Sequence, residues 1–164
     1  MTTLQILVFT VNTPEGVKKF VSYLPHEFVM KHGLMGEGVL GQLRRPLEGS
    51  EPISPEVFIQ NRSFVDFMHG VIQRRAPETA GLAAEAQRQG EGWVYIVDQR
   101  TPNPSGDVPP QDVVGAFEVK GGSVEPNSYQ ANKRHRVMTA DGFVDLGVEI
   151  RDFLIEEVKA TVAE

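Results

Sequence analysis

The first third of the chain contains two patterns of apolar residues, a continuous run and a helical repeat. A continuous apolar run at residues 6–9, within 4–10, predicts a central strand buried on both faces. Thr13 and Pro14 then predict the start of a helix, as its N-cap and first helical residue. Apolar residues at i, i+3, i+4 and i+7 support this helix, which Pro25 ends. We therefore expect a buried strand followed by a helix.

The middle of the chain predicts a less regular part and then two helices. Glycines separate short apolar runs within residues 26–50, which favours two short strands. Ser54 and Pro55 predict the start of a helix that ends near Arg75. Its apolar residues spread around much of the circumference, which is typical of a helix in the core. Pro77 opens a second, alanine-rich helix.

The remaining residues contain the two clearest strands, at 93–98 and 113–120. A Gly-Gly turn follows and leads to a short strand at 123–125, then an irregular stretch over 126–143 and an amphipathic terminal helix. Several adjacent strands are joined by turns too short for a parallel crossover. The predicted fold is therefore α+β, with a mainly antiparallel sheet packed against about four helices on one face.

Residues 99–112 form a proline-rich connection between the two best strands. An unstructured connection of this length is uncommon within a compact domain and is often functional. The 52 residues that follow it are few for an independent core. We therefore expect a single domain over residues 1–164 with an arm or lid at 99–112; a surface loop without a role is the alternative.

Composition narrows the chemistry. The chain has no cysteine, which excludes disulfides, thiolate zinc sites and a cysteine nucleophile. Its start lacks the features of a signal peptide, so we expect a cytoplasmic protein without membrane contact. The net charge is −6 but unevenly spread: residues 120–136 hold four basic side chains against one acid, and residues 145–164 hold six acids against two basic side chains.

Three motifs fit their usual functions poorly. Residues 36–41 match Gly-x-Gly-x-x-Gly, but Pro46 leaves no room for the helix that dinucleotide binding requires. His26 and His32 are six residues apart, a spacing that chelates one ion on neither a helix nor a strand. His69 lies in the most apolar helix and is interpreted as a hydrogen-bonded core or boundary residue rather than a catalyst. No cofactor and no metal are expected.

The stretch 126–136 carries the most suggestive chemistry, with an aromatic ring, asparagines, a histidine and three cations. Guanidinium groups bind phosphate or carboxylate, tyrosine offers a stacking face, and histidine exchanges protons near neutral pH. Two residues that close the strand 93–98 are expected to lie close by. The candidate ligand-binding residues are Asp98, Arg100, Tyr129, Asn132, Arg134, His135 and Arg136. A solvated, charged connection is the alternative interpretation.

Three hypotheses for function follow. The first is a non-catalytic domain that self-associates, with the basic loop of one copy on the acidic helix of another in a homodimer. The second is an enzyme or sensor that binds a small phosphate- or carboxylate-bearing ligand through residues 126–136. The third is nucleic-acid binding through residues 133–136 with Tyr129 stacked on a base, although the net charge of −6 argues against broad binding of nucleic acid. The absence of a recognisable catalytic motif favours the first hypothesis.

Overall fold

A computed structural model describes residues 5–103 and 105–162 and gives an α+β fold. The described part contains four α-helices, two larger antiparallel sheets and a two-stranded ribbon. The prediction of an α+β fold with antiparallel strands and about four helices is confirmed, but the strands form three separate sheets rather than one. None of the helices in this part of the chain is long and apolar enough to cross a membrane.

The N-terminal sheet has the strand order β1-β2-β3-β4. Its strands are β1 (Leu7–Thr13), β2 (Gly16–Ser22), β3 (Val39–Leu43) and β4 (Phe58–Gln60). Strand β1 lies at an edge, and its side chains alternate between half-buried and exposed positions, with Val8 43% exposed. The prediction of a central strand buried on both faces is therefore wrong.

The helix predicted after Thr13 is also wrong, because β1 and β2 form a hairpin there. Thr13 pairs with Gly16, and Pro14 and Glu15 form the turn between them. The Thr13 hydroxyl accepts a hydrogen bond from the Glu15 amide and donates one to the Gly16 carbonyl. Gly16 has φ +118°, which a side chain would disfavour. The residues expected to start a helix thus close a tight turn.

Two further boundaries differ from the prediction. Of the two strands expected within residues 26–50, only β3 exists; residues 26–32 instead form helix α1 (His26–His32), which ends at Gly33. The long central helix is α2 (Arg62–Arg75), which starts after β4 rather than at Ser54. Its N-cap is Asn61, whose side chain accepts a hydrogen bond from the Ser63 amide.

The C-terminal sheet is built on β6 (Val113–Lys120), which pairs with three strands. These are β5 (Gly92–Val97), β7 (Ser123–Val124) and β8 (Gln130–Ala131). The short ribbon consists of β9 (Met138–Thr139) and β10 (Gly142–Phe143). The strands expected at 93–98, 113–120 and 123–125 are therefore confirmed, and the excursion over 126–143 contains three short strands.

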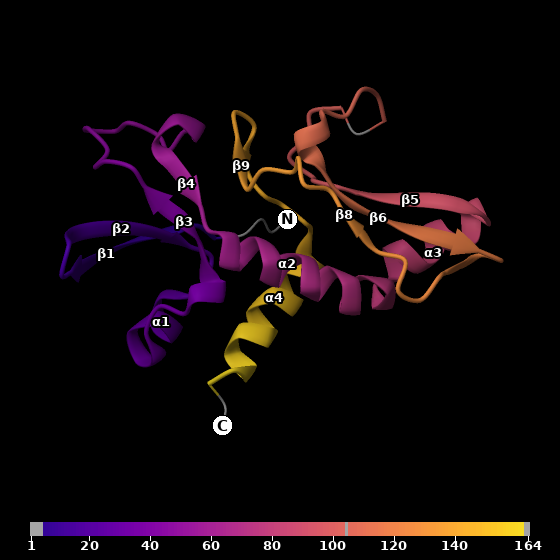
Figure 1. The fold of residues 1–164 in the computed structure, drawn as a ribbon, viewed down its shortest axis with the longest axis horizontal. Helices are drawn as coiled ribbons and strands as arrows, with labels where there is room; N and C mark the ends of the chain where they lie inside the picture. The colour runs from indigo at the N-terminus through magenta and orange to yellow at the C-terminus, as the bar shows by residue number, and fades with distance from the viewer. Residues whose placement is uncertain (1–4, 104, 163–164) are drawn as a thin grey trace.

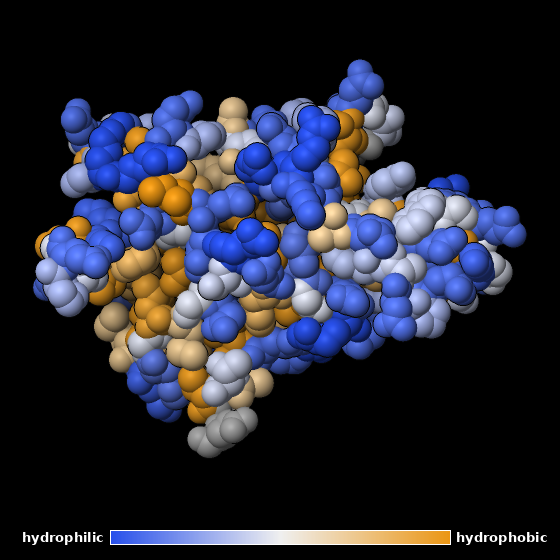
Figure 2. All heavy atoms as spheres, viewed as in Figure 1, coloured by the Kyte–Doolittle hydropathy of each residue, from blue (hydrophilic) through white to orange (hydrophobic). Residues whose placement is uncertain are grey.

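Helix α2 runs through the middle of the molecule and connects its two sheets (Figure 1). Helix α3 (Ala80–Gln89) lies against the C-terminal sheet, and α4 (Val148–Ala160) crosses α2. Phe64, Met68 and Ile72 of α2 are fully buried and form the centre of the core. On this view, hydrophobic residues gather between the N-terminal strands and α1, whereas the C-terminal half is mostly hydrophilic (Figure 2).

Candidate functional site

A cleft of about 700 Å³ lies between α2 and the chain segment 129–135. One wall consists of α2 side chains three or four residues apart, and hence on one helix face: Arg62, Val65, Asp66, His69 and Gln73. The other wall consists of Tyr129, Ala131, Asn132, Lys133 and His135. Two of the four histidines of the chain therefore line one cleft, from elements far apart in sequence.

The pairing of β8 with β6 brings the second wall into place. Ala131 pairs with Gly115, and the Tyr129 ring packs against Phe117 with ring centroids 4.9 Å apart. A Cβ atom at position 115 would lie 2.5 Å from the Tyr129 hydroxyl oxygen and 2.7 Å from the Gln130 carbonyl oxygen. Only glycine at this position lets the tyrosine pass so close to the sheet.

His69 and Tyr129 form a hydrogen-bonded pair across the cleft, with 2.7 Å between Nδ1 and the hydroxyl oxygen. Burial raises the pKa of Tyr129, so the phenol stays protonated at neutral pH. Burial lowers the pKa of His69 to about 4. His69 is therefore neutral at pH 7. Its Nδ1 accepts the phenol proton, which assigns the ring proton to Nε2.

His135 of the cleft wall forms a second pair with Asp98, which lies in the interior behind it. Asp98 Oδ2 lies 3.0 Å from His135 Nε2, and the side chains are 0% and 2% exposed. The other oxygen of Asp98 accepts hydrogen bonds from the backbone amides of Arg100 and Asp145. Both carboxylate oxygens are thus engaged, which fixes the carboxylate. The carboxylate orients the imidazole and leaves Nδ1 without a hydrogen-bond partner among the described residues.

Arg100 lies behind the same wall and is only 3% exposed in its side chain. Its guanidinium donates to Asp112 Oδ1 at 2.8 Å and to four backbone carbonyls. These carbonyls belong to Gln111, Arg136, Val137 and Gly142. All of its donor nitrogens are therefore used inside the protein. Arg100 joins loops together, and no donor remains for a ligand.

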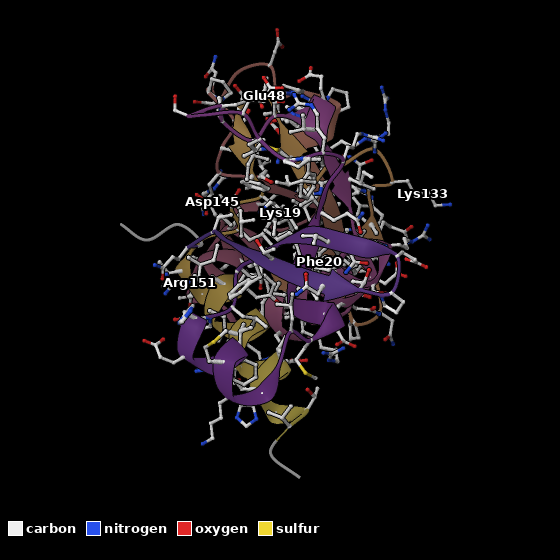
Figure 3. The ribbon with its side chains drawn as sticks, turned by 90° about the vertical axis from the view of Figure 1, so that its left-hand side faces the viewer. Lys19, Phe20, Glu48, Lys133, Asp145 and Arg151 are labelled. Atoms are coloured by element: carbon white, nitrogen blue, oxygen red, sulfur yellow. The ribbon has the colours of Figure 1, made fainter. Side chains whose placement is uncertain are left out.

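The remaining candidate residues lie in different surroundings. The Asn132 side chain donates to the carbonyls of Pro110 and Val113 and accepts from the Arg134 amide, so it stabilises its own loop although it lines the cleft. Lys133 is exposed, and its side chain extends away from the body of the molecule at the rim (Figure 3). The side chain of Arg134 is exposed and is not part of the cleft lining.

Arg136 lines a neighbouring cavity of about 650 Å³ together with Arg44 of the N-terminal half. Gln60 lines both this cavity and the cleft. Its side-chain oxygen accepts a hydrogen bond from the Val137 amide at 3.0 Å, which ties the two halves together at this point. The cleft and the cavity are thus neighbours across Gln60, each with two cationic side chains in its wall: Arg62 and Lys133 in the cleft, Arg44 and Arg136 in the cavity.

Three of the seven candidate residues, Tyr129, Asn132 and His135, line the cleft. Asp98 and Arg100 lie beside the 126–136 stretch, as the sequence predicts, through contacts with His135 and Arg136. Reasoning from the sequence missed Asp112 and assigned His69 no role in a site. No local pattern joins His69 to Tyr129, because 60 residues separate them. The one feature of the sequence that could have pointed to His69 was its position as a polar residue on an apolar helix.

The chain matches no protein-family model, no curated protein sequence and no solved structure. Over residues 5–103 and 105–162, no group of three or more histidine, aspartate or glutamate side chains is placed to hold a metal ion. The cleft itself is therefore the basis for an argument about function.

Proposed function

We propose that the protein binds an anionic, phosphate- or carboxylate-bearing ligand in the cleft between α2 and residues 129–135. The main support is the His135 imidazole, which a buried carboxylate holds in the cleft wall with one nitrogen unpartnered among the described residues. This nitrogen lies in a residue that lines the cleft, so a ligand there can supply the missing hydrogen-bond partner.

The charges around the cleft support an anion. Arg62 and Lys133 carry positive charge in its walls, and the neutral His69 has an N–H group available on Nε2. Asp66 is the single acidic residue in the lining, and its carboxylate accepts from the Arg62 guanidinium. Guanidinium and ammonium groups bind phosphate through charge-assisted hydrogen bonds.

Calorimetric titration with inorganic phosphate and pyrophosphate tests this proposal. Wild-type protein is expected to bind pyrophosphate more tightly than phosphate, and to melt at higher temperature in its presence. The double variant Arg62→Gln, Lys133→Gln removes both rim charges and is expected to weaken binding about thirtyfold, since each charged hydrogen bond is worth about 1 kcal/mol at an exposed rim and about 1.4 kcal/mol corresponds to tenfold. Arg88→Gln on α3, a matched loss of charge away from the cleft, should bind as the wild type does. Equal weakening in all variants, or no binding at all, contradicts the proposal.

Self-association remains a second candidate, and a different surface favours it. Strand β5 lies at a sheet edge and exposes Trp93 (41%) and Tyr95 (61%) on one face. An exposed edge strand with aromatic side chains suits antiparallel pairing with a second copy. By contrast, Glu156 and Glu157 of the acidic helix already pair with Arg75 and Arg74 of the same chain. Sedimentation at high protein concentration tests this candidate. If the wild type and Trp93→Lys both sediment as a single monomeric species, self-association is ruled out.

A further inference from the structure

Each of the two histidines in the cleft is anchored by one nitrogen only. His69 uses Nδ1 to bind Tyr129, and His135 uses Nε2 to bind Asp98. The second nitrogen of each ring has no hydrogen-bond partner among the described residues, and both rings line the same cleft. Such a pair of anchored imidazoles, one from each wall, is a suitable arrangement for moving a proton from one reacting atom to another.

The anchors give the two rings complementary proton states. Asp98 accepts the Nε2 proton of His135, so the base in the reaction is the Nδ1 lone pair of the ring. Tyr129 donates to His69 Nδ1, and this places a proton on Nε2. The burial that keeps His69 neutral lowers its pKa to about 4, so this N–H group persists at pH 7. One ring can thus accept a proton while the other presents one.

The attacking oxygen must come with the ligand or from water, because no serine, threonine or cysteine lines the cleft and the Tyr129 hydroxyl is bonded to His69. The cations also extend beyond the cleft, since Arg44 and Arg136 line the cavity on the other side of Gln60. A ligand with successive phosphates would place one phosphate at the histidines and the next at this arginine pair. A ribonucleotide chain supplies both the phosphates and an internal hydroxyl next to each phosphodiester.

We infer that the cleft cleaves the phosphodiester bond of a single-stranded RNA, with His135 as general base and His69 as general acid. This inference rests on the proposed function, since it requires an anion in the cleft. The net charge of −6 disfavours binding along a broad surface, but a few nucleotides threaded past His69 and His135 need only local cations.

The reaction balances without a further reactant. His135 Nδ1 takes the proton of the 2′-hydroxyl, and the oxygen attacks phosphorus as the bond from phosphorus to the 5′-oxygen breaks. The leaving 5′-oxygen takes the Nε2 proton of His69, while Tyr129 passes its phenol proton to His69 Nδ1. An alkoxide is a stronger base than a tyrosinate, so this transfer is favourable. The products are a 2′,3′-cyclic phosphate and a 5′-hydroxyl. His69 Nδ1 then returns its proton to Tyr129, and the proton on His135 passes through solvent to His69 Nε2, which restores both rings.

Cleavage of a fluorescently labelled RNA, with DNA of the same sequence as control, tests the inference. Wild type is expected to cleave the RNA to a 2′,3′-cyclic phosphate, detected by mass spectrometry, and to bind the DNA without cleaving it. His135→Gln and His69→Gln should each lower the cleavage rate at least a hundredfold. His32→Gln, on α1 and outside the cleft, should cleave as wild type does.

Tyr129 acts through His69, so its variant needs a separate readout. Tyr129→Phe keeps the ring packing and is expected to lower kcat while leaving KM and the melting temperature close to wild type. If this variant cleaves at the wild-type rate, the proton path through the phenol is overturned. It also serves as the well-folded variant should either histidine substitution prevent folding.

The outcomes separate this inference from the proposed function. If DNA and pyrophosphate bind but RNA stays intact, the catalytic inference falls and ligand binding stands. If cleavage is equally fast in His135→Gln, the activity does not belong to the cleft and the inference is overturned. If neither phosphate compounds nor oligonucleotides bind, both proposals are contradicted.

Discussion

Replacing Arg100 with methionine removes a buried cation while keeping much of the side-chain volume. The guanidinium is 3% exposed and lies 2.8 Å from Asp112 Oδ1, whose other oxygen has no hydrogen-bond partner among the described residues. Asp112 would therefore become a buried carboxylate without a counter-charge. Four backbone carbonyls would also lose their donor. We expect a loss of about 3–5 kcal/mol in the free energy of unfolding, the usual cost of breaking a buried ion pair.

Urea denaturation measures this loss directly, and a thermal melt should show a fall of about 6–20 °C for a chain of this size. Arg136→Met is the matched control: its guanidinium is exposed and makes only long contacts of 3.4–3.5 Å to carbonyls. It should cost less than about 0.5 kcal/mol. Adding Asp112→Asn to Arg100→Met should recover part of the loss, because the unpaired charge is gone. If Arg100→Met stays within about 1 kcal/mol of wild type, the argument that Arg100 organises these loops is refuted.

Two further predictions concern the cleft. The pKa of His69 falls from 6.5 to about 4 on folding, so the unfolded chain takes up this proton first as the pH drops. The free energy of unfolding should therefore be highest above pH 6.5 and decline towards pH 4 by about 1–3 kcal/mol, allowing for the partial exposure of the ring. Urea titrations across this range should show a smaller decline in His69→Gln. Identical pH profiles of the variant and the wild type would contradict the lowered pKa of His69. Gly115→Ala should push Tyr129 away from His69 and cost about 1–3 kcal/mol, measured by urea denaturation. Gly81→Ala on α3, where a Cβ meets nothing within 4 Å, should instead be neutral or stabilising by up to about 1 kcal/mol, and equal losses in both would rule out the steric argument.

The N-terminal hairpin shows why the pattern of apolar residues misled the prediction. Thr13, Pro14 and Glu15 suit a helix N-terminus and also a tight turn, since proline fixes φ at a value that both require. The residues after them fit a helical period, yet β2 pairs with β1 on one side and β3 on the other. The choice between helix and strand depended on pairing partners up to 22 residues away, and those contacts are not visible in a local window.

The candidate site, too, could be predicted from the sequence only in part. The sequence indicated the stretch 126–136 and the end of β5, because polar chemistry was concentrated in short segments. It did not indicate that His69 would face the same cleft, since that depends on how α2 packs against β8 and its neighbours. Nor did it separate Arg100, whose donors are all used internally, from the cations at the rim. The type of each residue can be read from a short stretch of sequence, but its burial and its hydrogen-bond partners depend on the tertiary fold.

The histidine signals offer the most direct test of the central claim, that the cleft is where the ligand binds. The chain has four histidines: His69 and His135 line the cleft, whereas His26 and His32 lie on α1. We would record the imidazole resonances by NMR while pyrophosphate is added. The account predicts saturable shifts for His69 and His135 with no change at His26 and His32. No saturable shift at His69 and His135, or equal shifts at all four histidines, would contradict it.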